Sequence, residues 1–80
     1  MEQYIATFHT HLAALRTCNA LKKQGVSDAR LAPVPRKLSV SCGTCVRFSA
    51  PFRPEWADED LEAVYLQEGE DYRPLWRNEE

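Results

Sequence analysis

The chain has 80 residues, 44% of them hydrophobic and 28% charged, a composition typical of one small globular domain spanning residues 1–80. It contains no long apolar run, and its first residues lack the charged and apolar parts of a signal peptide, so we expect a cytoplasmic protein without membrane contact. The three cysteines, Cys18, Cys42 and Cys45, are an odd number, which argues against a disulfide scaffold.

The net charge of −2 conceals an asymmetry, because residues 1–50 carry a net charge of +5 and residues 51–80 a net charge of −7. Charge runs are usually solvated surface, but a basic half can also face an anionic ligand or an acidic partner. Trp56, Trp76 and Tyr72 lie in the acidic half. They are therefore predicted to cover the core rather than to stack on bases, and we expect no nucleic-acid partner.

The first third of the chain predicts a strand followed by a helix. Residues 3–8 combine alternation with β-branched and aromatic side chains, which is the pattern of a strand. Thr10 can cap a helix that runs to about Gln24, and Gly25 suits the position after a helix end. The buried stripe of this helix is predicted to consist of Ala14, Cys18 and Leu21, with Leu15 beside them. Cys18 is accordingly interpreted as an inert buried thiol.

Two short strands are predicted next, over residues 29–34 and 45–49. Prolines end the first of them, and the intervening loop over residues 35–44 carries the basic side chains of Arg36 and Lys37.

A second helix is predicted over residues 57–68, and a last strand over residues 72–77. Acidic residues crowd the first turns of the helix, where the helix dipole favours them. Its apolar residues recur at helical spacing: Ala57, Leu61, Val64 and Tyr65. Pro74 confines the last strand to a sheet edge, because proline cannot donate a ladder hydrogen bond.

The predicted order is β-α-β-β-α-β, so the expected fold is α+β: a ferredoxin-like βαββαβ two-layer sandwich in which the first and last strands are neighbours. A βαββα unit with a loose C-terminal tail is the alternative. In the sandwich the ends of the first two strands and the start of the third meet at one edge of the sheet. The histidines, the basic loop and the cysteines would then gather beside the N-terminus of the first helix, which favours anions.

The stretch with the most evident chemistry is Ser41-Cys42-Gly43-Thr44-Cys45, downstream of the basic loop residues. Positive charge favours the thiolate, which is the form of cysteine that attacks or binds other groups. Cys42 is the candidate reactive thiol and Cys45 the second thiol. The candidate anion-stabilising residues are His9, His11, Arg36 and Lys37.

Several segments together resemble a family of small, uncharacterised bacterial selenium/sulfur carrier-like proteins. The resemblance covers roughly residues 3–70, and its most specific part is Pro33-Val34-Pro35-Arg36 followed by Ser41-Cys42-Gly43. The pair Phe8-His9 supports it. The family position that is matched is Cys42. The resemblance does not rest on Cys45, so a one-thiol mechanism follows from it more directly than a two-thiol one.

The resemblance implies a thiol carrier rather than a turnover enzyme. Cys42 would accept sulfur or selenium from a donor protein, hold it as a persulfide or selenosulfide, and pass it to an acceptor protein. Cys45 could release the chalcogen by forming a disulfide with Cys42. Such a carrier requires no cofactor and no metal.

The residues themselves leave three other functions open. Cys42 and Cys45 have the C-x-x-C spacing of thiol–disulfide redox modules, although those motifs usually open a helix rather than a strand. His9, His11, Cys42 and Cys45 could supply a tetrahedral zinc site, which would make zinc the cofactor. In a non-catalytic regulatory interaction module, the thiols would be incidental.

Overall fold

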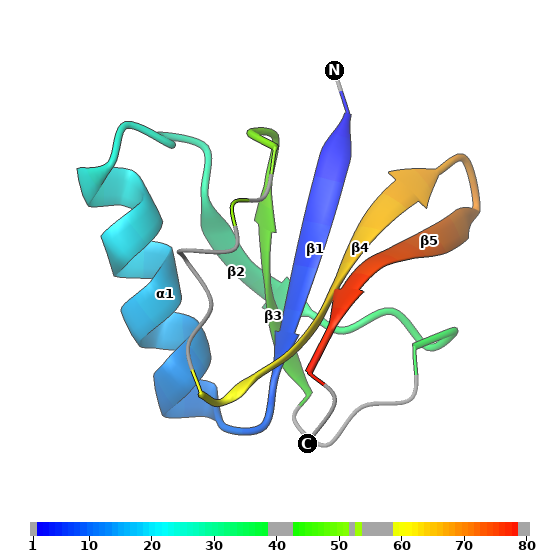
Figure 1. Ribbon diagram of the computed structural model, residues 1–80, viewed down its shortest axis with the longest axis horizontal. Helices are drawn as coiled ribbons and strands as arrows, with labels where there is room; N and C mark the ends of the chain where they lie inside the picture. The colour runs from blue at the N-terminus through cyan, green and yellow to red at the C-terminus, as the bar shows by residue number, and fades with distance from the viewer. Residues whose placement is uncertain (1, 39–42, 52, 54–58, 79–80) are drawn as a thin grey trace.

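The computed structural model describes residues 2–38, 43–51, 53 and 59–78. In this part of the chain, one helix packs on a five-stranded sheet with the order β2-β3-β1-β4-β5, in which every pair of neighbouring strands is antiparallel (Figure 1). The elements are β1 (Gln3–Phe8), α1 (His11–Lys23), β2 (Arg30–Pro33), β3 (Thr44–Phe48), β4 (Leu61–Glu68) and β5 (Asp71–Arg77). The α+β class predicted from the sequence is confirmed.

The first strand and the first helix form as the sequence predicts. β1 covers Gln3–Phe8, and the Thr10 hydroxyl caps α1 by accepting a hydrogen bond from the Ala13 N–H at 3.1 Å. Gly25 follows the helix with a φ of +96°, a backbone conformation that a side chain would strain. The predicted stripe of Ala14, Cys18 and Leu21 is buried, whereas Leu15 is 39% exposed.

The larger core lies between α1 and the sheet. α1 packs on β3, β1 and β2, and every second residue of the central strands points toward it. The Tyr4 and Phe48 rings, opposite each other on β1 and β3, stack with centroids 5.6 Å apart. The other strand residues of this core are Ala6, Phe8, Val46, Leu61, Val64 and Leu66.

The alternate side chains on the face away from α1 are also buried: Ile5, Thr7, Cys45, Ala63 and Tyr65. The Thr7 hydroxyl donates to the Ala63 carbonyl at 3.3 Å, which satisfies a fully buried polar group. Residues 34–38 leave the end of β2 and run past the sheet to the turn between β4 and β5 (Figure 1). The central strands are therefore covered on both faces.

The second predicted helix is wrong, because residues 61–68 form strand β4 rather than the end of a helix. β4 pairs with β1 along its length, and both of its faces are buried. A strand buried on both sides does not alternate between apolar and polar residues, so Leu61, Val64 and Tyr65 imitate helical spacing. Residues 57 and 58 lie outside the described part. Gly69, predicted to end the helix, instead has a φ of +63° between β4 and β5.

The predicted strand neighbours are corrected as well. β1 pairs with β3 and β4, whereas the last strand, β5, pairs only with β4. The ferredoxin-like order βαββαβ is therefore not what the described residues show, and the alternative with a loose tail is wrong, because residues 71–77 belong to the sheet.

The two edge strands each contain a proline. β5 is an edge strand with Pro74, as the sequence predicts, and β2 ends at Pro33 on the opposite edge. Trp76 of β5 packs against the core as expected, and Tyr72 is half-buried. Trp56 lies outside the described residues.

Candidate functional site

The N-terminus of α1 meets the start of β3. His11 is the first residue of the helix, and its Nδ1 lies 3.1 Å from the Thr44 hydroxyl oxygen. The pairing of Thr7 with Cys45 sets the end of β1 beside the start of β3, so the short connection from β1 into α1 places His11 there. The sequence predicts that the loop over residues 35–44 lies beside His9 and the start of the helix; Thr44 does so, whereas Lys37 lies at the turn between β4 and β5.

The electrostatics of this end of the helix favour an anion. A helix N-terminus carries partial positive charge on its unpaired N–H groups, and the first turn of α1 contains no acidic residue to neutralise it. The side chains of His9 and His11 are both exposed, so the imidazoles are accessible from solvent. The His9 backbone N–H donates to the Asp60 carbonyl at 2.9 Å, which ties this turn to the segment before β4.

Cys45 is a fully buried thiol within β3. Its exposed fraction is 0%, and the thiol donates a weak hydrogen bond to the Pro33 carbonyl, with 3.6 Å between Sγ and the oxygen. Burial raises the pKa of Cys45 because a thiolate is poorly solvated there, although the positive charges of Arg47 and Arg30 partly oppose this effect. Cys45 is therefore a protonated thiol at neutral pH and a poor nucleophile.

The raised pKa of Cys45 predicts a loss of stability in alkaline solution. The contribution of the neutral thiol is fully present below its unfolded pKa of about 8.5 and is lost as the pH rises through the folded pKa. Cys45→Ala should therefore show a smaller fall in the free energy of unfolding between about pH 8 and pH 10, measured by urea titration. The pKa of Tyr4 is also raised, mainly by desolvation, and it contributes equally to both proteins. Identical pH slopes would contradict the prediction.

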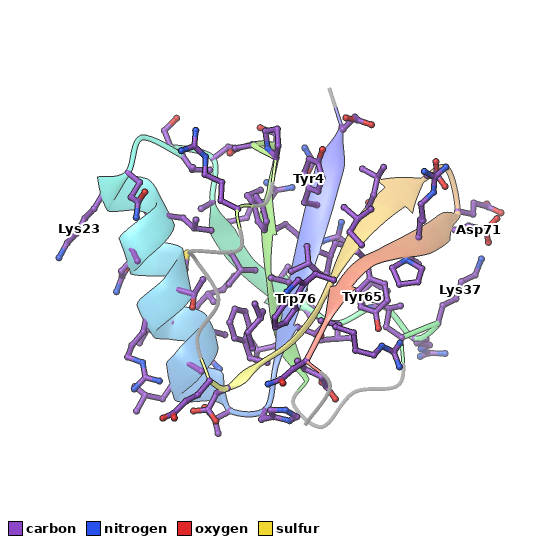
Figure 2. The ribbon with its side chains drawn as sticks, viewed as in Figure 1. Tyr4, Lys23, Lys37, Tyr65, Asp71 and Trp76 are labelled. Atoms are coloured by element: carbon purple, nitrogen blue, oxygen red, sulfur yellow. The ribbon has the colours of Figure 1, made fainter. Side chains whose placement is uncertain are left out.

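The other predicted site residues do not all gather here. Cys42, the candidate reactive thiol, lies outside the described residues. Lys37 donates from Nζ to the Glu70 carbonyl at 2.7 Å and lies 3.4 Å from the Asp71 carboxylate (Figure 2). This turn follows the end of β4 that pairs with the beginning of β1, so the structure does not bring Lys37 to His11. Arg36 is exposed in the same segment.

No group of three or more His, Cys, Asp or Glu side chains that could hold a metal ion occurs among the described residues. His9, His11 and Cys45 therefore do not form three corners of a tetrahedral zinc site. The Cys45 thiol lies on the buried face of β3 that points away from α1, whereas both imidazoles are exposed.

An open hollow of about 570 Å³ lies at the other end of α1. Its walls come from the residues after the helix and from the chain that leaves β3. Hydrogen bonds from Ser49 hold the pKa of Asp28 below its usual value, so Asp28 joins the two walls as a carboxylate. The hollow is thus separate from the His11 end of the fold.

Sequence reasoning did not single out Thr44, the hydroxyl that contacts His11. Its signal is its position as the first residue of β3, directly before the buried Cys45. Leu12 of α1, which is 59% exposed near this site, was also missed, and Leu15, predicted beside the buried stripe, is 39% exposed. A large apolar residue in the first turn, next to the helix cap, is the signal for Leu12.

Residues 3–62 match the model of the family described as "Putative Se/S carrier protein-like", which is three quarters of the chain. The chain belongs to this family. It is also 30% identical over 71 residues to "Uncharacterized protein YtiA" of Escherichia coli (strain K12), an alignment that covers 85% of this chain and 82% of the relative. No matching solved structure was found.

The matched residues of the Se/S carrier-like family include the candidate site. They extend from β1 through α1, β2 and β3 to the first residues of β4, so the His11–Thr44 contact and both Cys42 and Cys45 fall within the match. Most of β4 and all of β5 lie beyond it. A bilayer-spanning helix is not found among the described residues, whose helical stretches are too short or too polar for one.

Proposed function

We propose that this protein is a thiol carrier that holds sulfur or selenium on Cys42 and passes it between partner proteins. The observation that carries the proposal is the contact between His11, at the N-terminus of α1, and Thr44, at the start of β3. Cys42 precedes Thr44 by two residues, and two residues of chain span at most about 7 Å. The proposal is that the Cys42 thiol works beside the exposed imidazole of His11 and the N-terminus of α1.

The chemistry of loading is a transfer between thiols. The Cys42 thiolate attacks the terminal sulfur of a persulfide on the donor, a new S–S bond forms on Cys42, and the S–S bond of the donor breaks to leave a donor thiolate. A terminal selenium would be transferred in the same way. The N–H groups of the first turn of α1 and a protonated His11 or His9 would stabilise the persulfide or selenosulfide anion. Arg36 remains a proposed contributor, whereas Lys37 is engaged with Asp71.

The state of Cys45 supports a one-thiol carrier. Release through Cys45 would need its thiolate to attack Cys42, with a Cys42–Cys45 disulfide forming and the hydrosulfide leaving. The burial and the raised pKa of Cys45 both oppose that attack in the folded protein. The same two features weigh against a C-x-x-C redox module, in which the two thiols exchange electrons with a partner. Direct attack of an acceptor thiolate on the terminal chalcogen needs only Cys42.

The proposed donors and acceptors would contact the outer face of α1. Leu12, 59% exposed, lies directly after His11, and Leu15 lies one turn further along. The helix contains no acidic residue, and Lys22 and Lys23 lie in its last turn. This face suits a partner protein whose surface combines apolar and acidic residues, and it begins beside the His11–Thr44 contact.

Leu12→Ser should lower the second-order rate of sulfur transfer from a donor protein at least about tenfold, because burying one leucine contributes roughly 1.5–3 kcal/mol. The rate is measured by quenched-flow mass spectrometry at sub-saturating donor. Leu75→Ser is the matched control, since Leu75 is 46% exposed on β5, at the far edge of the sheet from α1. Equal effects of the two substitutions would show that the partner does not use this face.

The proposal as a whole is tested by intact-mass spectrometry after incubation with a cysteine desulfurase and cysteine. A carrier gains the mass of one sulfur atom, and a thiol reductant removes it. A loss of two hydrogens would instead support the redox module. Protein that stays unmodified but binds one equivalent of zinc tightly would support the metal site.

A further inference from the structure

Two arginines lie directly opposite each other on the face of the sheet away from α1. Arg30 of β2 pairs in register with Arg47 of β3, and Arg47 in turn pairs with Ile5 of β1. Like charges in directly opposite positions of an antiparallel pair repel each other, so this placement costs stability in the empty protein.

Neither guanidinium forms a salt bridge within the described part of the chain, although the charge of Arg30 helps to lower the pKa of the nearby Asp28 carboxyl. Arg30 donates from its two terminal nitrogens to the Asp28 carbonyl and the Gln3 side-chain oxygen, both at 3.2 Å. Arg47 donates to the Gln67 side-chain oxygen at 3.0 Å. All three acceptors are neutral amide oxygens. By contrast, Arg73 lies 2.7 Å from a carboxylate oxygen of Glu68, as expected for a basic residue with an acid within reach.

The two glutamines hold the guanidinium groups along the surface of the sheet. Gln3 and Gln67 are opposite each other on β1 and β4, so each arginine reaches two strands across from its own. Arg47 is half-buried and uses one of its five N–H donors in these contacts. Arg30 is exposed and uses two. Donors therefore remain on both groups, on the same side of the sheet.

The positive potential of this pair extends along the face. Both charges act to lower the pKa of the Cys45 thiol, two residue pairs along the strands, even though burial outweighs them. The thiol itself lies too deep to be the counter-ion, with an exposed fraction of 0%.

We propose that Arg30 and Arg47, positioned by Gln3 and Gln67, form a binding site for a small oxyanion of the sulfate, phosphate or selenite type. The planar guanidinium fork matches two oxygens of such an anion, and two forks side by side match a doubly charged one. A bound dianion would remove the repulsion between the two arginines. The site is distinct from the His11–Thr44 end of the fold and does not depend on Cys42.

The test is a nuclear magnetic resonance titration of the full chain with sodium sulfate, phosphate and selenite, each against sodium chloride at matched ionic strength. Saturable shifts are expected for the Arg30 and Arg47 side-chain N–H signals and for the Gln3 and Gln67 side-chain amides. Arg47→Gln should weaken binding at least about tenfold, because it removes a charge-assisted hydrogen-bonding group. Arg47→Lys should also weaken it, since the charge is kept but the fork is lost. The order of affinities among the three anions identifies the natural class of ligand.

Three further variants make the outcome decisive. Arg73→Gln should leave the affinity unchanged, because Arg73 already has its own carboxylate partner. Arg30→Gln alters an exposed side chain and provides a second reading if Arg47→Gln folds poorly. Cys42→Ala should bind the anions as the wild type does. The anion site is therefore tested independently of the proposal that Cys42 carries sulfur or selenium. Shifts that chloride reproduces, or an equal loss in Arg73→Gln, would overturn the site. The site would also be overturned if Arg30→Gln self-associates while its anion affinity is unchanged. The charge of Arg30 would then serve to keep the exposed edge of β2 from pairing with another chain.

Discussion

Cys42→Ala is expected to abolish the sulfur adduct completely, whereas Cys18→Ala should leave it unchanged. In the proposed mechanism the adduct is a covalent bond to the Cys42 sulfur, so no other group can replace it. Cys18 is 3% exposed on the buried stripe of α1, and a partner protein cannot reach it in the folded state. The measurement is the intact mass of each variant after incubation with desulfurase and cysteine, followed by peptide mapping of the modified residue.

Cys45→Ala separates the one-thiol mechanism from the two-thiol mechanism in the same experiment. If Cys42 acts alone, the adduct forms and decays at the wild-type rate. If Cys45 resolves the persulfide, its removal prolongs the life of the adduct, because the internal attack that releases hydrosulfide is gone. An adduct that survives in Cys42→Ala and maps to Cys18 or Cys45 would contradict the assignment of the reactive thiol.

Phe8→Ala is expected to lower the free energy of unfolding by about 3–5 kcal/mol, the usual cost of deleting a buried aromatic ring. Phe8 is 0% exposed at the end of β1, where it packs in the core shared with α1. A domain of 80 residues has a total stability of roughly 4–12 kcal/mol, so the substitution removes a large share of it. The effect is measured by urea denaturation as a shift in the midpoint at constant slope.

The control for Phe8→Ala is Leu75→Ala, which truncates a side chain that is 46% exposed on β5 and should cost about 0.5 kcal/mol or less. A loss of less than about 1 kcal/mol at Phe8 would mean that the core between α1 and the sheet is not packed as described. Since Phe8 directly precedes the connection to α1, the variant should also loosen the contact between His11 and Thr44.

The first half of the fold could be predicted from sequence because its signals are local. The Thr10 cap, the stripe of α1 and the glycine at position 25 each act within a few residues, and all three are found as expected except that Leu15, predicted beside the stripe, is exposed. β4 could not be predicted in this way. Its residues form a strand because β1 and β5 flank it and both of its faces are covered. β5 is near β4 in the sequence, but β1 is not.

The candidate site was predictable to a similar degree. The closeness of the helix start to the beginning of β3 follows from the β1-α1-β2 connection and the position of β3 between β1 and β2, and the His11–Thr44 contact confirms it. The position of Lys37 could not be predicted from the sequence. A loop side chain contacts whichever partner the tertiary fold places within reach, which here is Asp71. Arg30 and Arg47 are 17 positions apart in the sequence. Their pairing depends on the register of β2 against β3, which sequence spacing alone does not reveal.

The central position of β1 has a consequence for the growing chain. β1 is synthesised first, yet its partners, Thr44–Phe48 and Leu61–Glu68, are among the later segments. At ribosomal rates of about 5–20 residues per second, β1 waits several seconds with both of its hydrogen-bonding edges open, and open apolar strands are prone to aggregate. α1 follows immediately and can form from local contacts, covering one face of β1 through Ala14 and Cys18. The nascent protein therefore depends on this early strand–helix unit to shield a strand that the finished sheet encloses on both sides.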